Sequence, residues 1–482
     1  QKKIMIDSDA NIMKKWLEVD RFPLAKYPSK FSPTLMQQLA INIAISEKDR
    51  YEKIFSVNGP PGTGKTTLLK EIIASNVVQL AEVLIKYGID GGNFVSRKIE
   101  SASNASYIEK YYEIPEEIAK FGILVVSNNN GAVENVTLDL PKSGDMEKEK
   151  TRTDYFDRKI NREVYFSAVA DNLLGEEGSA WGLISARMGR KSYVAEVLES
   201  CVFARKNDDS NKVTLDLARV DSISWNEAIE KFNIAKKKVL SLRKDIKNDQ
   251  KLLVDFYQEK ENLDKRKWEL KQLTIEKEQL NKKLNEVKTE LENNEKETLE
   301  QEEEIKYIKE HSSIFKKLLI LLGLGKIGRH VAEKQKYVDE LIIQHEDIKR
   351  RYSLTKRNTE EVCGKIENQY SIISTLEKKV QILEEKVYGN NESLKNKYKN
   401  NFADRYFYEN IKESENSQNA CPWTFDEYDM AREELFYASL QVRKAFILNS
   451  PYIKRNLFVY QAYNNGKYTI AEKQEMFPHL FN

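Results

Sequence analysis

Apolar residues recur at every third or fourth position along two long segments of the chain, with charged residues between them. The first series comprises Leu252, Phe256, Leu263, Leu270, Leu273, Leu280, Leu284, Val287, Leu291, Ile305 and Ile308, with polar residues at positions 277, 294, 298 and 301. The second comprises Val362, Ile366, Ile373, Leu376, Val380, Leu383 and Val387. Because sustained heptads with interspersed charges are typical of coiled coils, we expect two long helices that pack through these seams.

The residues that break helices are missing from this region. No proline occurs between Pro141 and Pro422, and residues 226–322 also lack glycine. Charge is dense, with 16 basic and 19 acidic residues in positions 241–310. These features permit long solvated helices, and at 1.5 Å per residue an arm of ~80 residues would extend on the order of 120 Å.

An apolar and then glycine-rich stretch, residues 314–325, separates the two series. It predicts a turn, after which the chain returns as the second arm of an antiparallel coiled-coil hairpin. Lys316, Lys317, Lys326 and Arg329 surround the apolar residues 318–322 of this tip, near positions 312–330. We expect the tip to clamp nucleic acid, to dock a protein partner or to self-associate, unless its leucines only cap the core of the hairpin.

The segments on either side of the hairpin have the composition of globular protein. Residues 1–225 mix helical and strand patterns, whereas residues 390–482 are rich in aromatic residues and mostly helical in pattern. The hairpin, residues 226–389, is therefore predicted to be an insertion into one globular domain that holds both of its ends.

Composition excludes several kinds of protein. The 482 residues contain 78 basic and 76 acidic side chains, so any affinity for nucleic acid requires a local patch rather than overall charge. The three cysteines are far apart and do not pair with any of the four histidines, which excludes a disulfide scaffold and a zinc site and favours the cytoplasm. We also expect no membrane partner, because no apolar run reaches the ~18–20 residues of a membrane span.

The strongest chemical signal is the sequence Gly-Pro-Pro-Gly-Thr-Gly-Lys-Thr-Thr at residues 59–67. It matches the phosphate-binding loop G-x-x-x-x-G-K-[ST], follows a short apolar strand at 54–58 and precedes a helix predicted from Leu68 to about Lys86, ended by Gly88. The backbone N–H groups of such a loop surround phosphates. Lys65 would contact the β- and γ-phosphates, and the Thr66 hydroxyl would bind Mg²⁺.

A second signal is the apolar run at residues 123–126 with the Asn-rich turn that follows it. Four apolar residues predict a buried parallel strand, and its carboxyl end is where α/β sheets bind ligands. Uncharged side chains at this turn could contact a phosphate backbone, or they could simply cap the next helix.

Together these segments resemble superfamily 1 helicases, in the branch with the nonsense-mediated-decay helicase and large bacterial AAA-type helicases. Residues 59–66 match motif I of that family, residues 127–134 match motif Ia, and residues 31–41 resemble the Q motif. Residues 180–187 and 432–440 are also similar to stretches of the large bacterial members, which carry a coiled-coil insertion in the same interval. The implied fold is an α/β RecA-like P-loop NTPase domain with a parallel sheet, interrupted by the hairpin.

The resemblance also implies roles for individual residues. Gln37 would contact the adenine of ATP, with Gln38 as an alternative, and Lys65 is the candidate catalytic residue. Nucleotide binding is expected at Gln37, Gly59, Pro61, Gly62, Thr63, Gly64, Lys65, Thr66 and Thr67, and Mg²⁺ binding at Thr66. Single-stranded nucleic acid is the expected partner, bound by Ser127, Asn128 and Asn130.

The family pattern is incomplete in this chain. Motif II requires an apolar strand ending in Asp-Glu, but Asp426 and Glu427 follow no such strand and are predicted to open a helix through Arg432 and Leu440. No initiator Met is present either. We therefore interpret the chain as the amino-terminal half of a helicase motor that is incomplete for hydrolysis by itself.

Three other classes share parts of this pattern. SMC-like ATPases combine a P-loop with a long coiled coil, but they need a Leu-Ser-Gly-Gly-Gln-type signature that the chain lacks. AAA+ ATPases carry an Asp-Glu on the next core strand, where this chain has Ser and Asn. A scaffold that binds nucleotide without hydrolysing it is the remaining alternative.

Overall fold

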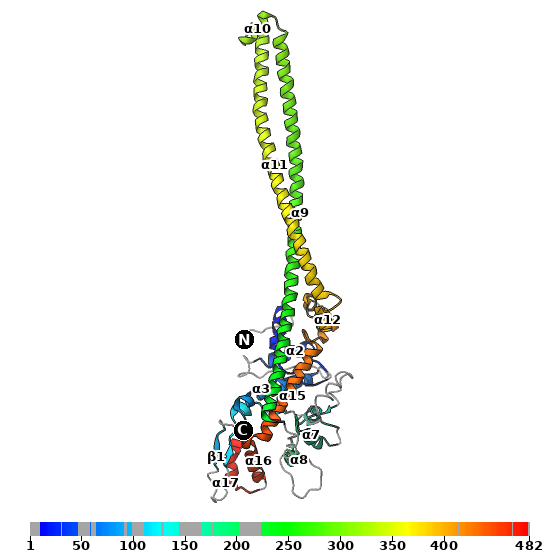
Figure 1. Ribbon diagram of the computed structural model, residues 1–482, viewed down its shortest axis with the longest axis vertical. Coiled ribbons are helices and arrows are strands. Elements are labelled where there is room, and N and C mark those ends of the chain that lie inside the picture. Colours follow the sequence, from blue (N-terminus) through cyan, green and yellow to red (C-terminus); the bar gives the residue numbers. More distant parts are fainter. Residues whose placement is uncertain are drawn as a thin grey trace. The chain divides into compact units, whose positions relative to one another are not determined.

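The computed structural model describes residues 10–29, 31–46, 58, 64–90, 94–98, 110–126, 130–143, 165–175, 178–201, 223–409, 411, 414–464 and 466–480 (Figure 1). The chain divides into two compact units. Residues 1–250 and 394–482 form unit 1, and residues 251–393 form unit 2. Unit 1 is thus built from two separate stretches of the sequence.

Unit 1 is mainly helical. Among the residues described before 225, its helices are α1 (Ala10–Trp16), the short 3-10 helix η2 (Val19–Arg21), α2 (Leu35–Ala44), α3 (Lys65–Tyr87), α4 (Glu116–Ala119), α5 (Asn130–Asp139), α7 (Ser167–Leu174) and α8 (Lys191–Cys201). Its helices after residue 393 are α12 (Leu394–Tyr398), the 3-10 helix η8 (Lys399–Asn401), α13 (Arg405–Glu409), α14 (Glu415–Asn419), α15 (Asp426–Asn449), α16 (Pro451–Asn464) and α17 (Ile470–Leu480). Asp426 therefore opens a helix, as predicted.

The helix expected after the phosphate-binding loop is confirmed. It is α3, which starts at Lys65 and ends at Tyr87. The helix stops at Gly88, which has a positive φ of 73° with ψ of 165°, and the Gly88 N–H donates to the carbonyl oxygen of Leu84 at 2.9 Å. Glycine accepts this conformation without steric cost, which is why it ends helices so often.

The core of unit 1 forms where α3 packs against α15 and α2. Sixteen residues of α15 are buried, from Tyr428 to Leu448, because this helix lies inside the unit rather than on its surface. The ring of Tyr27 packs edge-on against Trp181, with centroids 5.7 Å apart, and against Phe436 at 5.4 Å. Segments from the beginning, middle and end of the sequence thus share one core.

The parallel sheet expected from the sequence is not seen in the described residues. Their only strands are β1 (Ser96–Lys98) and β2 (Lys110–Tyr112), which pair antiparallel with Arg97 opposite Tyr111. Of the strand expected at 54–58, residues 54–57 lie outside the described part of the chain.

The prediction of a buried strand at residues 123–126 is wrong for this structure. The segment has no regular secondary structure, and Leu124 is 82% exposed. A parallel strand is buried when other strands pair with its edges and helices cover both faces of the sheet, and no described strand pairs with this segment.

Unit 2 contains most of two long helices that run antiparallel. They are α9 (Trp225–Glu310, 86 residues), whose first part belongs to unit 1, and α11 (Gly325–Tyr388, 64 residues), with the short α10 (Ile314–Leu321) between them (Figure 1). Arg351 on α11 makes two hydrogen bonds to Glu290 on α9, of 2.7 and 3.1 Å. Lys379 lies 2.6 Å from Glu259, so later residues of α11 meet earlier residues of α9.

The side chains predicted to form the seams are the buried or half-buried positions of these two helices, as periodicity indicated. Polar positions of the pattern also lie in the seam. Asn294 is buried, and its side-chain amide donates to the carbonyl oxygen of Leu341 at 3.3 Å. An apolar side chain at position 294 would pack in the seam without needing a hydrogen-bond partner, whereas the buried amide of Asn294 needs one.

Candidate functional site

The N-terminus of α3 presents the described part of the phosphate-binding motif. Gly64 caps the helix in a left-handed conformation, and its carbonyl oxygen accepts from the N–H of Thr67 at 2.9 Å. Lys65 and Thr66 follow and are exposed. Of the expected nucleotide-binding residues, Gly59, Pro61, Gly62 and Thr63 lie outside the described residues. The helix start offers a cation and a hydroxyl beside its own partial positive charge.

Gln37 lies directly against this helix start. Thr34 and Gln37 form a capping box at the beginning of α2, in which the N–H of Thr34 donates to Oε1 of Gln37 at 2.9 Å. The amide nitrogen of the same side chain faces Gly64, where an added Cβ would overlap it. The structure therefore brings together Gln37 and Gly64, which are far apart in the sequence.

Gln38, the alternative to Gln37, has a different environment. Its side chain is buried, its amide donates to Oδ1 of Asn42 at 2.7 Å, and its Oε1 faces Sγ of Cys421 at 3.5 Å. These contacts hold Gln38 in the core, so Gln37 is the glutamine at the start of α3.

A buried cluster of charged side chains joins α3 to α15 and to the segment around Lys26. Glu71 lies on α3, and its carboxylate is 3.6 Å from the guanidinium of Arg432 on α15. Arg432 also lies 3.4 Å from Asp429, and Lys26 lies 2.8 Å from Glu433. Each of these side chains is buried, so the cluster replaces hydration with opposite charge.

Burial and charge shift the acidity of this cluster. Burial raises the pKa of Glu71 to about 7, although Arg432 and Lys26 oppose the shift. Oε1 of Glu71 accepts from the N–H of Tyr27 at 3.2 Å, whereas Oε2 has no hydrogen-bond partner among the described residues. A carboxyl group in such a place carries a proton more readily than one in water.

The segment expected to bind nucleic acid is described in part. Ser127 and Asn128 lie outside the described residues, and Asn130 begins α5. Four residues later, Glu134 forms a 2.9 Å ion pair with Arg187 and accepts from the hydroxyl of Tyr193 at 3.4 Å. Glu134, the last residue of the predicted motif Ia, thus contacts the stretch 180–187 through Arg187.

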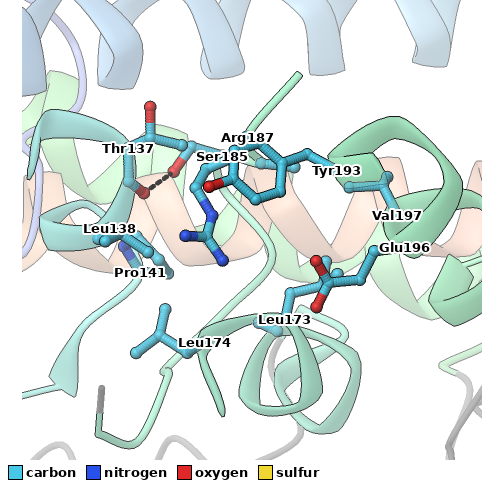
Figure 2. Close-up of a pocket in the computed structure, with 12 residues that line it drawn as sticks. Thr137, Leu138, Pro141, Leu173, Leu174, Ser185, Arg187, Tyr193, Glu196 and Val197 are labelled. Atoms are coloured by element: carbon cyan, nitrogen blue, oxygen red, sulfur yellow. Dashed lines mark hydrogen bonds between the residues drawn. The ribbon is translucent and has the colours of Figure 1, made fainter. Parts of the chain in front are cut away.

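Arg187 and Tyr193 lie beside each other in this region (Figure 2). The guanidinium of Arg187 is 4.4 Å from the ring centroid of Tyr193, and that of Arg190 is 5.6 Å from it. The hydroxyl of Ser185 donates to the carbonyl oxygen of Thr137 at 2.7 Å, which ties this stretch to α5.

An open pocket of about 590 Å³ adjoins these side chains. Arg187, Arg190 and Tyr193 line it together with Arg443 of α15 and the exposed apolar segment 123–126. Glu134, which pairs with Arg187, lines it as well, so three guanidinium groups, one carboxylate and a tyrosine ring give it a wall of net positive charge. Sequence reasoning missed Arg190, Tyr193 and Arg443, and only the similarity noted at residues 180–187 pointed toward this region.

Comparison with known families gives one match to the chain. Residues 35–406 match the model of a family described as AAA domain, which is more than half of the chain. The chain belongs to this AAA domain family. The AAA domain is a P-loop NTPase domain found in superfamily 1 helicases, and proteins of this type generally bind ATP with Mg²⁺. Among curated proteins and solved structures, none matches the chain.

The AAA domain match covers Gln37, the start of α3 and the helix pair of unit 2. It also covers Trp181, whose indole N–H donates to the carbonyl oxygen of Leu140 at 3.0 Å. Trp181 packs against Phe436 and Tyr437, with ring centroids 5.9 and 5.8 Å apart. Residues 180–187 and 432–440 are therefore in contact in the core of unit 1.

The residues present suit a Mg²⁺–nucleotide complex at α3 of the AAA domain. Lys65 offers a cation and Thr66 an oxygen ligand. Gly64 has a positive φ, and a Cβ at this position would overlap the amide of Gln37. Among the described residues no group of three His, Cys, Asp or Glu side chains could hold a metal ion elsewhere. Within the same residues no helix has the length and apolar character needed to cross a bilayer.

Proposed function

We propose that the protein is an ATP-dependent nucleic-acid helicase or translocase of superfamily 1, and that this chain carries its ATP-binding portion. The AAA domain match supports the NTPase class. The observation that carries the finer proposal is the contact of Gln37 with Gly64, which joins the predicted Q motif to the predicted phosphate-binding motif. We place the protein in the cytoplasm, in line with its dispersed cysteines.

In this proposal Lys65 binds the β- and γ-phosphates, and the Thr66 hydroxyl holds Mg²⁺. The amide of Gln37 contacts the adenine, and Gly64 keeps the backbone open beside it. Bound Mg–ATP supplies the phosphoryl group whose transfer to water drives movement. The protein contributes positioning and positive charge, which are the main contributions of proteins to phosphoryl transfer.

Single-stranded nucleic acid is the proposed track. Ser127, Asn128 and Asn130 would contact its phosphates without reading bases. The positive wall of Arg187, Arg190 and Arg443 supports this proposal, because guanidinium groups bind phosphates and can stack on bases. Tyr193 lies in the same wall and offers a ring for a base to stack on.

The helix pair of unit 2 is proposed to be an antiparallel coiled coil inserted into the motor domain. Its predicted heptads, its buried seams and its cross-helix ion pairs support this interpretation. The insertion would extend the surface available to partners without altering the nucleotide site.

Calorimetry with Mg–ATP tests the nucleotide site. Lys65→Ala removes the cation at the start of α3 and should weaken binding by about 10- to 100-fold, as the loss of a charge-assisted contact does. Lys86→Ala is the matched control, because Lys86 is exposed in the last turn of the same helix and should leave the affinity unchanged. Equal affinities for wild type and Lys65→Ala would refute the site.

A further inference from the structure

The end of the helix pair in unit 2 exposes a large apolar surface. Six large apolar side chains of the segment 311–332 are exposed, and Ile314 is 89% exposed. They are Ile314, Phe315, Leu318, Leu321, Leu322 and Leu324. Isolated exposed apolar residues are ordinary, but a contiguous group on one short helix usually marks a contact surface. We name residues 311–332 the tip.

The tip holds its apolar face outward. Ile320 packs toward the core formed by Ile305, Val331 and Val338, so only part of α10 covers the end of the helix pair. At Gly328 the backbones approach closely, since an added Cβ would lie 2.5 Å from the carbonyl oxygen of Leu319. Because this side is already packed, the exposed face is available to another molecule rather than to the hairpin itself.

The charge of the tip is of one sign. The tip contains Lys316, Lys317, Lys326 and Arg329 and no Asp or Glu. All four basic side chains are exposed, and none forms an ion pair with a described residue. A partner must therefore combine apolar contacts with negative charge.

The same chain carries a surface of that kind on α9. Residues 297–304, which we name the acidic stretch, contain Glu297, Glu300, Glu302, Glu303 and Glu304 and no Lys or Arg. Glu302 and Glu303 are exposed, and within the described residues neither forms an ion pair. Leu299 and Tyr307, four residues before and after Glu303, are 60% and 63% exposed and lie on its face of the helix.

We propose that the tip binds the acidic stretch of a second copy of this chain. A two-fold arrangement would form the contact twice, with each tip on the acidic stretch of the partner copy. Tip against tip would oppose like charges. The acidic stretch beside the tip also disfavours a nucleic acid or an anionic bilayer, because both are negatively charged. This inference is independent of the nucleotide site.

Charge reversal provides a test with its own rescue. The tip variant carries Lys316→Glu and Lys317→Glu, and the stretch variant carries Glu302→Lys and Glu303→Lys. All four positions are exposed, so neither variant should change the melting curve of the full chain. Lys349→Glu with Arg350→Glu, at exposed positions of α11 away from both surfaces, is the control.

Sedimentation velocity over a range of protein concentrations should show a wild-type dimer that weakens as salt is added. For each variant alone, the dissociation constant of the dimer should rise about tenfold or more. The control variant should dimerise as wild type does. An equimolar mixture of the two variants should restore dimerisation, because the reversed tip meets a reversed stretch in the heterodimer.

Three results would overturn the proposal. The first is a wild-type chain that stays monomeric at every concentration. A monomer that binds anionic phosphatidylglycerol vesicles in a flotation assay is one form of this result. The second is a dimer that neither reversal weakens, which would place the contact elsewhere. The third is a mixture of the two variants that fails to restore dimerisation, which would exclude the acidic stretch as the partner of the tip.

Discussion

The guanidinium of Arg432 lies 3.6 Å from the carboxylate of Glu71, and neither side chain is more than 2% exposed. This contact joins α15 to α3, the helix that begins at Lys65. Arg432 also donates to the carbonyl oxygens of Pro23 and Ala25, both at 3.2 Å. The position of the proposed nucleotide site therefore depends on residues that never touch nucleotide.

Removal of Arg432 should be strongly destabilising. Arg432→Ala leaves Glu71 and Asp429 buried with Lys26 as their remaining cation, and we expect a loss of about 3–5 kcal/mol in the free energy of unfolding. Arg405→Ala is the control, since Arg405 pairs with Glu409 on the surface and is 69% exposed. Its loss should be below ~1 kcal/mol. Urea unfolding measures both, and similar losses would show that the buried cluster contributes little.

The stability of the protein should depend on pH through Glu71. Burial raises the pKa of Glu71 to about 7, whereas a carboxyl in the unfolded chain titrates near 4.5. Between these values the folded protein holds a proton that the unfolded chain has lost, so this contribution to stability falls as pH rises.

Glu71→Gln should remove this dependence. Glutamine does not titrate, so the variant should gain on wild type between pH 4.5 and 7 by on the order of 3 kcal/mol. Urea unfolding at several pH values measures the difference. A gap between the two proteins that stays constant across this range would contradict a raised pKa at Glu71.

Alanine substitutions at the two glycines that flank α3 distinguish backbone strain from steric overlap with a neighbouring side chain. Gly64 and Gly88 both have φ of 73°, but an added Cβ at Gly64 would overlap Gln37, whereas at Gly88 nothing lies within 4 Å. Gly88, with ψ of 165°, lies in a region that almost only glycine adopts, so Gly88→Ala should cost about 1–3 kcal/mol through backbone strain alone. Gly64, with ψ of 32°, is left-handed, so Gly64→Ala should cost about 1–2 kcal/mol of strain plus the overlap with Gln37, and only this variant should weaken ATP binding.

The excess cost at Gly64 should depend on its neighbour. Adding Gln37→Ala to Gly64→Ala removes the overlapping amide, so the two changes should be less harmful together than their sum. Additive losses in thermal unfolding would mean that the contact between Gln37 and Gly64 does not constrain the site.

The positive wall of the pocket should affect nucleic-acid affinity. Arg190 lines the pocket and is exposed, whereas Lys191, its neighbour at the start of α8, is exposed but does not line it. We expect Arg190→Ala to weaken binding of a short single-stranded oligonucleotide by about 3- to 10-fold and to lower its salt dependence. Lys191→Ala should have little effect. Fluorescence anisotropy compares them, and equal losses would point to general charge rather than this pocket.

Local patterns predicted the parts of the structure that local physics determines. Gly88 marked the end of α3, and the heptads marked the buried sides of α9 and α11, because helix termini and seams depend on residues a few positions apart. The resemblance to helicases, and not the spacing of residues, indicated that Gln37 belongs with the nucleotide site at the start of α3.

Other features depend on residues far apart in the sequence. In a chain with 32% charged residues, Lys26 and Arg432 read as surface side chains, yet both are buried. Arg443 joins Arg187 in one pocket although more than two hundred positions separate them. The apolar run 123–126 predicted burial, but composition cannot say whether neighbouring strands cover it.

The pairing of Lys26 with Glu433 has a consequence for synthesis of the protein. The two residues are 407 positions apart, and at 5–20 residues per second a ribosome needs roughly 20–80 s to make that stretch. During this time Lys26 and Glu71 have been translated but α15 has not. Unit 1 cannot close until α15 emerges, whereas the helix pair is complete earlier. The growing chain therefore carries a folded arm attached to an unfinished domain, and chaperones have about a minute in which to bind that domain.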